Sequence, residues 1–163
     1  MNHDINKDTP MDVSNEISVT ERQRWMSILA KAPTEQLMAL SESGTNSYEF
    51  EVIRKPEVGL TQVRARMGAK GDQFNLGDMT ITRCVVRSPE GSLGYSYIAG
   101  RKKDHALRAA KVDALLQEES LTTLILNDVI KPLEKIILQD RIKKQQQSAN
   151  TKVDFFTLVR GED

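Results

Sequence analysis

The sequence has one cysteine, no excess of charge of either sign and no long apolar run, and each absence excludes a class of protein. Cys84 alone can form no intrachain disulfide and cannot by itself build a structural zinc site. Basic and acidic residues both count 23, so overall charge gives no reason to expect binding to nucleic acid or to an anionic membrane. No segment has the roughly 20 apolar residues that cross a bilayer, and residues 1–16 lack the apolar core of a signal peptide. We therefore expect a cytoplasmic protein with no metal site, no membrane contact and no nucleic-acid partner.

The length of 163 residues fits one domain preceded by a short tail, because domains usually hold roughly 100–200 residues. Residues 1–18 mix Asn, Asp, Ser and Thr with scattered apolar residues, and such a composition buries too little surface to offset the entropy of ordering. We predict a mobile polar tail over residues 1–18 and a single α+β domain over residues 19–163.

Helical patterns stand at both ends of this domain. Thr20 and Gln23 match a capping box before an apolar stripe over 21–31, and Thr34 suits the N-cap of a second short helix that ends at Ser43-Gly44. Helical spacing returns from Asp104, a candidate cap, to residue 117. It continues over 121–144, where Pro132 is expected to break or kink the helix.

Between these helices the pattern alternates, which predicts an antiparallel β-meander of about four strands. Residues 56–59 and 88–91 read as the short turns between neighbouring strands. Alternation places Gln62, Arg64 and Arg66 on one face, whereas neither face of the third run is cleanly apolar, as in a sheet covered on both sides. A final strand is predicted near the C-terminus, where Phe155 and Phe156 need burial. The predicted strands are 48–55, 60–67, 79–88, 93–99 and 153–160.

Arginines gather among the strands and turns of residues 63–108, although the chain as a whole is neutral. Arg101, Lys102 and Lys103 precede a predicted helix, whose free N–H groups favour an anion; the alternative is a solvated basic turn. His105 titrates near neutrality and is a possible acid or base.

Other polar motifs have ordinary structural explanations. Gly77-Asp78 is best read as a turn, and Cys84 as a small buried residue. No nucleophile–base pair, paired carboxylates or cofactor fingerprint is present. The residues alone therefore indicate a soluble α+β protein with a basic sheet face.

Short segments along the chain form a series of motifs that resembles a known family. They are Arg24-Trp25-Met26-Ser27, Tyr48-Glu49-Phe50-Glu51-Val52-Ile53-Arg54, Glu57-Val58-Gly59-Leu60, Ala65-Arg66-Met67-Gly68, Phe74, Gly77-Asp78, Thr80-Ile81-Thr82-Arg83, Val86-Arg87, Gly94-Tyr95-Ser96-Tyr97, Gly100-Arg101, His105-Ala106, Asp113-Ala114-Leu115 and Val153-Asp154-Phe155-Phe156-Thr157-Leu158-Val159-Arg160-Gly161. In this order they resemble the PhnG family, the G subunit of the bacterial carbon–phosphorus lyase core complex. Residues 118–150 carry little of the resemblance.

The resemblance implies a role in phosphonate breakdown that the residues alone do not show. In that family the G, H and I subunits, with an ATP-binding-cassette-like L subunit, replace the adenine of ATP by methylphosphonate. The product is α-D-ribose 1-methylphosphonate 5-triphosphate, and the J subunit later breaks the carbon–phosphorus bond. The implied partners are the H, I and J subunits and, functionally, L. ATP, with magnesium, is a substrate of the complex, and this chain alone holds no cofactor.

The resemblance carries over no catalytic residue to this chain. We expect a transferase subunit that is inactive alone, and we predict that its arginines and one histidine bind substrate phosphate, because guanidinium groups bind phosphate oxygens in pairs. The alternative is a purely structural scaffold subunit that does not touch substrate. The predicted phosphate-binding residues are Arg64, Arg66, Arg83, Arg101 and His105.

Overall fold

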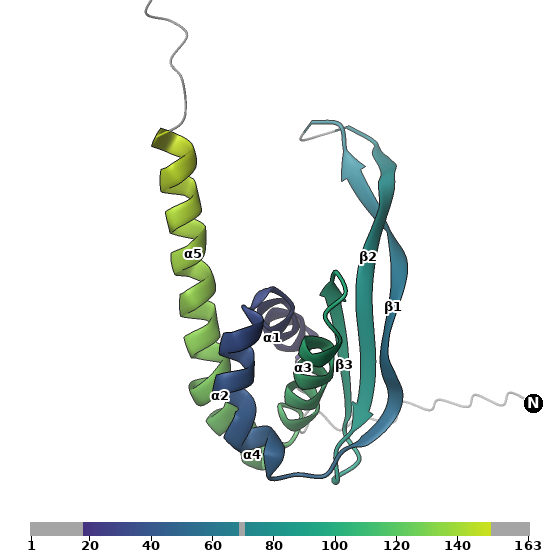
Figure 1. Ribbon diagram of the computed structural model, residues 1–163, viewed down its shortest axis with the longest axis vertical. Coiled ribbons are helices and arrows are strands. Elements are labelled where there is room, and N and C mark those ends of the chain that lie inside the picture. Colours follow the sequence, from purple (N-terminus) through teal and green to yellow (C-terminus); the bar gives the residue numbers. More distant parts are fainter. Residues whose placement is uncertain (1–17, 69–70, 151–163) are drawn as a thin grey trace, which may run out of the picture.

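Three antiparallel strands form one sheet, and α3 covers one of its faces (Figure 1). The computed structural model describes residues 18–68 and 71–150. The strand order is β1-β2-β3, a simple meander. The elements are α1 (Val19–Lys31), α2 (Thr34–Asn46), β1 (Glu51–Arg66), β2 (Gln73–Arg87), β3 (Leu93–Ala99), α3 (Lys103–Leu115), α4 (Glu119–Ile125), the π-helical turn η1 (Leu126–Ile130) and α5 (Lys131–Asn150).

The predicted α+β class is confirmed, but the predicted count of about four strands is wrong, because the described residues form three. The first two predicted strands are one strand, β1, which continues through the expected turn at 56–59. Pro56 is tolerated there because β1 is an edge strand, and a register shift between Arg54 and Glu57 leaves the residues between them out of the ladder. The strand predicted over 153–160 lies outside the described residues.

Gly77-Asp78 is likewise not a turn, because both residues lie within β2 opposite Val63 and Gln62. The chain reverses instead after Met67, whose carbonyl accepts the N–H of Gly71. Gly68, at a φ of 62°, supplies the left-handed backbone that this turn needs. The sequence has glycines both at 68 and 71 and at 77, so the presence of glycine alone does not show where the chain reverses.

The predicted helices are present, with different ends. Ser18 rather than Thr20 caps α1, since its hydroxyl accepts the N–H of Glu21 at 3.2 Å. Thr34 is the first residue of α2 and not its cap, and α2 continues past Ser43-Gly44 to Asn46. Lys102 takes the N-cap position of α3, so that Asp104 lies within the first turn.

Pro132 follows directly on a change of helix type and not on a break. A proline has no N–H to donate to the carbonyl one turn earlier, and its ring needs extra room there. The wide π-helical turn η1 lies immediately before Lys131 and Pro132, and α5 continues beyond it. Within the described residues no helix is both long enough and apolar enough to cross a bilayer.

Small residues let α3 lie directly on the sheet. Gly94 of β3 is buried, and a Cβ atom added to it would lie 2.0 Å from the carbonyl oxygen of Ala110. The buried side chains of β2 alternate with exposed ones, as expected for a sheet with one covered face. The side chains that face the helices are Thr82, Cys84 and Val86. Cys84 and Val86 belong to a core with Trp25, Leu37, Val112, Leu115, Leu116 and Leu133.

Asp113 of α3 ties α1 to the edge of β3. Its buried carboxylate accepts hydrogen bonds from Arg22 at 2.7 Å, from the Trp25 indole at 2.8 Å and from the backbone N–H of Tyr95 at 2.9 Å. The Arg22 guanidinium also lies over the Tyr95 ring. Three donors therefore compensate one buried negative charge, and removal of the carboxylate would leave them unsatisfied.

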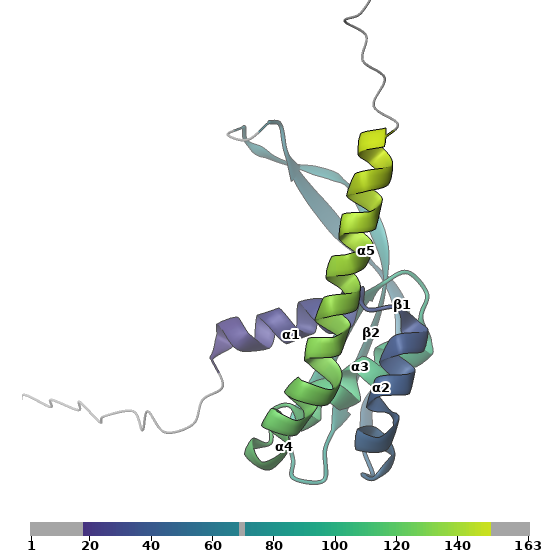
Figure 2. The same ribbon diagram turned by 90° about the vertical axis from the view of Figure 1, so that its left-hand side faces the viewer.

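β1 and β2 extend far beyond the end of β3 as a two-stranded ribbon, which we call the arm (residues 60–66 and 73–80). Pairing of β2 with β3 stops at Ile81 opposite Ala99, whereas pairing with β1 continues to Gln73 opposite Arg66. The arm and α5 both project to the same side of the body, separated from each other (Figures 1 and 2).

Candidate anion-binding site

The arginines of the described residues fall into two groups, according to whether they are bonded to another residue. Four make no hydrogen bond or ion pair within the described part of the chain, and a guanidinium without a protein partner is available to an anion. The bonded arginines are Arg22, Arg24, Arg54, Arg83, Arg87 and Arg108. The unbonded ones are Arg64, Arg66, Arg101 and Arg141.

Arg64 and Arg66 lie on the arm, on the face that continues the helix-covered side of the sheet. Residues directly opposite each other in a ladder share a face, and Leu60 is opposite Thr80. Arg64 is four residues after Leu60 in β1 and therefore lies on the same face. Thr80 is on the same side of β2 as the buried Thr82. The predicted alternation in β1 is confirmed, since the arginines are exposed and the residues between them are partly buried.

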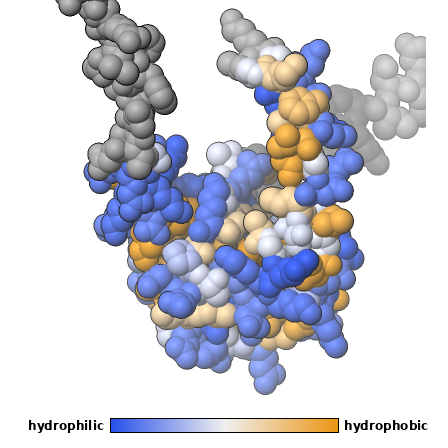
Figure 3. All heavy atoms as spheres, turned by 45° about the horizontal axis from the view of Figure 1, so that its top comes forward, coloured by the Kyte–Doolittle hydropathy of each residue, from blue (hydrophilic) through white to orange (hydrophobic). Residues whose placement is uncertain are grey.

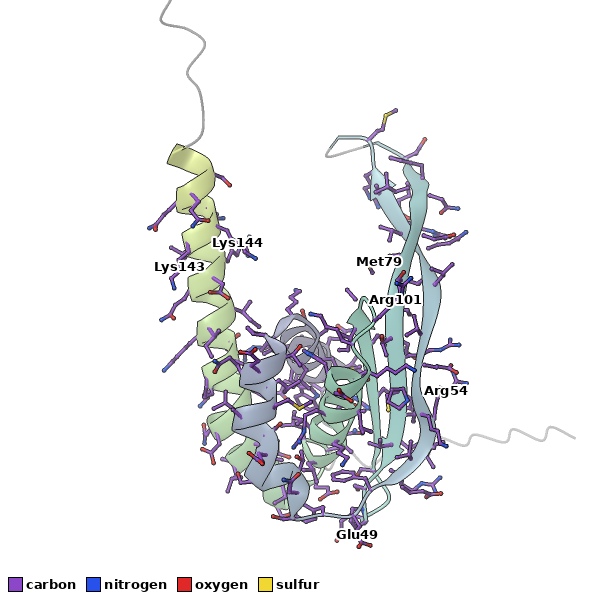
Figure 4. The ribbon with its side chains drawn as sticks, in the orientation of Figure 1. Glu49, Arg54, Met79, Arg101, Lys143 and Lys144 are labelled. Carbon is purple, nitrogen blue, oxygen red and sulfur yellow. The ribbon has the colours of Figure 1, made fainter. Side chains whose placement is uncertain are left out.

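Arg101 lies at the base of the arm, in a turn that is bonded to β2. The N–H of Gly100 donates to the Thr80 carbonyl at 2.8 Å, and the Thr82 hydroxyl donates to the Gly100 carbonyl at 2.6 Å and accepts the N–H of Lys102 at 3.1 Å. Figure 4 shows Arg101 beside Met79, where the arm leaves the body. These bonds hold a cationic turn at a defined place beside the arm.

Arg83 does not join this group. It points from the opposite face of β2, and its Nε donates to Glu57 at 2.7 Å. Glu57 also contacts Arg54 at 3.3 Å, so that one carboxylate serves two guanidinium groups. The charge of Arg83 is therefore partly compensated within the chain.

His105 lies in the core and is 1% exposed. Its Nε2 lies 2.8 Å from the Leu29 carbonyl, which can only accept, so Nε2 carries the proton and Nδ1 accepts the hydroxyl of Thr34 at 3.0 Å. Burial lowers the pKa of His105, more than the bond to Leu29 raises it. His105 is thus a neutral link between α1, α2 and α3. The five predicted site residues do not form one cluster, and substrate contact by any of them remains a prediction.

Basic side chains of α5 add positive charge on the side of the molecule to which the arm projects. The sequence alone did not indicate them as site residues. A groove of about 550 Å³ lies between α5 and the junction of α1 with α2, and its lining includes Lys31, Arg141 and Lys144 together with Asp140. Figure 4 shows Lys144 on the side of α5 that faces the arm and Lys143 on the other side. Arg141 and Lys144 are three residues apart, which places them on one helix face. This spacing was the feature of the sequence that could have predicted a cationic face on α5.

These groups can bind an anion but offer little chemistry of their own. Among the described residues no group of His, Cys, Asp and Glu side chains could hold a metal ion. Cys84 is buried, as predicted, and burial raises the pKa of its thiol, which disfavours the reactive thiolate. The described residues therefore provide positive charge around an open surface, without a nucleophile placed beside a base.

An α+β body whose arm exposes Leu60, Leu76 and Phe74 beside open cationic surfaces is typical of a component of a larger assembly, because exposed apolar patches mark protein–protein contacts. A family model described as "Phosphonate metabolism protein PhnG" matches residues 20–161. The chain is also 35% identical over 150 residues to "Alpha-D-ribose 1-methylphosphonate 5-triphosphate synthase subunit PhnG" of Rhizobium meliloti (strain 1021), a match that covers 92% of this chain and 96% of that relative. The chain belongs to the PhnG family.

Proposed function

We propose that this chain is a non-autonomous subunit of α-D-ribose 1-methylphosphonate 5-triphosphate synthase. It takes part in the transfer of ribose 5-triphosphate from ATP to methylphosphonate, with release of adenine. The observation that carries the proposal is the 35% identity, across 92% of the chain, to a relative named as a subunit of that synthase. The partners in this proposal are the H, I and J subunits and, functionally, L, in the cytoplasm, and ATP enters with magnesium as a substrate of the complex.

The part of this chain in the reaction is to hold the triphosphate. Adenine leaves and phosphonate attaches at C1′ of the ribose, whereas the triphosphate at the other end of the sugar keeps all its bonds. Cations that bind it therefore act through binding energy and orientation and not through proton transfer. Arg64, Arg66 and Arg101 suit this role because none of them has a partner within the described residues, and Arg101 is held in place by the turn bonded to Thr80 and Thr82.

Adenine release from ATP and methylphosphonate by the purified subunits tests the proposal. We expect no release when this chain is omitted from the set, and none from the chain alone. A double variant Arg64→Ala with Arg66→Ala should raise the KM for ATP by roughly tenfold or more, since a hydrogen bond to a charged group contributes about 1.5–3 kcal/mol. The control is Arg87→Ala, because Arg87 is paired with Glu51 at 2.8 Å and should leave the KM unchanged. Full activity without this chain would refute the proposal.

The second candidate is a structural scaffold that organises the complex without touching substrate. It draws on the groove lined by Lys31, Arg141 and Lys144, which is open to solvent and not an enclosed cavity, and on the arm, which no other described element covers. Native mass spectrometry of the Arg64→Ala, Arg66→Ala complex separates the two. Intact assembly with a raised KM for ATP supports substrate binding, whereas lost assembly supports the scaffold.

A further inference from the structure

Among the described residues, no strand lies beside the outer edge of β2 in the arm. The Thr80 carbonyl on that edge accepts the N–H of Gly100, the residue that follows the end of β3. In an antiparallel ladder the backbone groups of alternate residues point to the same edge, so those of Asp78 point to the same edge as those of Thr80. The register shifts once beyond Asp78, because Leu76 lies between Gly77, opposite Val63, and Asn75, opposite Arg64, and has no partner in β1. From Gln73 to Met79 the outward-pointing backbone groups have no hydrogen-bond partner among the described residues.

This edge has only part of the protection that natural edge strands have. Edges are usually blunted by lysine, proline, a β-bulge or a covering element, and this one carries a single register irregularity at Leu76 and one charge, Asp78. A two-stranded ribbon alone is also marginally stable in water. Residues 73–79 contain no lysine, arginine or proline, and they expose Phe74 and Leu76 to 42% and 65%. Leu60, across the ribbon, is 70% exposed. Figure 3 shows apolar side chains gathered along the arm, in contrast to the polar surface at α5.

The charges of the edge indicate what covers it. Asp72 and Asp78 flank the apolar residues and have no ion pair within the described residues. If two copies of this chain paired residues 73–79 in full antiparallel overlap, Asp78 of each copy would lie opposite Phe74 of the other. Residues 73–79 contain no lysine or arginine, so a second copy would bring no cation to either carboxylate. A second copy is therefore a poorer occupant than a strand with basic residues near its ends, which would pair with both aspartates.

We infer that the arm is completed by an extended strand of a partner subunit, apolar at its centre and basic near its ends, which adds to the free edge of β2 at residues 73–79. This mode of binding takes affinity from backbone hydrogen bonds and specificity from alternate side chains. The inference rests on the proposed membership of a multi-subunit synthase. Docking at this edge also holds the arm, with Arg64 and Arg66, against the partner, so that the triphosphate site is closed by both proteins.

Hydrogen exchange measured by mass spectrometry tests the inference, on the chain alone and on the chain co-expressed with the H, I and J subunits. We expect the amide protons of residues 73–79 to exchange at least tenfold more slowly in the assembly. Leu76→Lys should weaken recovery of the assembly at least tenfold, with an unchanged melting temperature of the free chain. Leu138→Lys on α5 is the matched control, because that leucine is exposed to a similar extent, 56%, and should assemble normally.

The other outcomes each overturn a stated claim. An assembly that forms with residues 73–79 unprotected, or with Leu76→Lys incorporated normally, refutes the docking edge and leaves the proposed function intact. Failure of the wild-type chain to assemble refutes the proposed function itself. Protection already present in the free chain and lost on removal of residues 151–163 would assign the edge to the chain's own C-terminal segment. A dimer of the free chain with a protected edge would assign it to a second copy.

Discussion

Gly94→Ala is expected to be the most damaging one-carbon change in the described part of the chain. The new Cβ would lie 2.0 Å from the Ala110 carbonyl oxygen, 2.7 Å from the Ala114 nitrogen and 2.8 Å from the Ala114 Cβ. The first two are backbone atoms of α3, so no side chain can rotate away, and the helix must move by about 1.5 Å to restore an ordinary contact near 3.5 Å. Overpacking of this kind typically costs about 1–3 kcal/mol, and a clash with backbone belongs at the upper end, about 3 kcal/mol.

Urea unfolding, followed by circular dichroism, measures the effect. Gly44→Ala is the control, because it adds the same carbon within α2, where nothing lies within 4 Å. Alanine has the better helix propensity, so this variant should gain about 0.5–1 kcal/mol. The midpoint should therefore fall for Gly94→Ala and rise for Gly44→Ala, with the m-value unchanged. Loss of less than about 0.5 kcal/mol in Gly94→Ala would refute the close approach of α3 to β3.

Three further predictions concern the polar groups that hold the helices. Asp113→Ala should cost about 3–5 kcal/mol in the free energy of unfolding, because it leaves a guanidinium, an indole N–H and a backbone N–H without their acceptor; a thermal melt within 2 °C of wild type would contradict this. Burial lowers the pKa of His105 below 6.5, so between the two pKa values the unfolded chain binds the extra proton. Stability should then fall as the pH drops below about 6.5, by up to about 1.4 kcal/mol per pH unit, and His105→Gln should flatten this part of the stability curve. Ser18→Ala should cost about 1 kcal/mol by removing the cap of α1, whereas Thr20→Ala, at the cap expected from the sequence, should cost less, as urea unfolding of both would reveal.

Sequence patterns correctly predicted features that depend on residues close together in the chain. They failed for features that depend on the position of an element in the folded structure. The alternation of β1 correctly placed Arg64 and Arg66 on one face, and β3 begins and ends where the sequence indicates. The sequence at 56–59 favours a turn, but β1 is an edge strand that tolerates Pro56, and no local signal shows that a strand will lie at an edge. The pairing of Arg83 with Glu57 joins residues 26 positions apart, so it depends on the register of β1 against β2.

The same limit explains why the predicted site residues separate in space. All five stand within the run of arginines and turns that was singled out, yet alternation sends Arg83 to the face opposite Arg64, and the closure of α1 and α2 over α3 buries His105. Whether an arginine has a carboxylate partner changes what its replacement is expected to do. An arginine that already holds a carboxylate contributes to the sheet, and its replacement alters local stability, whereas an arginine without a partner adds little to the free energy of folding.

The difference between paired and unpaired arginines indicates a role for the unpaired ones outside the folded monomer. Within the described residues, Arg64 and Arg66 have no carboxylate partner and no other element covers the arm, so these guanidinium groups add little to the stability of the folded monomer. The exposed leucines and the open strand edge beside them are unfavourable for a protein that works alone. Both features become favourable together if a second protein adds a strand to β2 and an anion lies between the two surfaces. The unpaired charge and the unpaired edge therefore support one interpretation, in which the site of the synthase lies at a subunit boundary and this chain supplies one side of it.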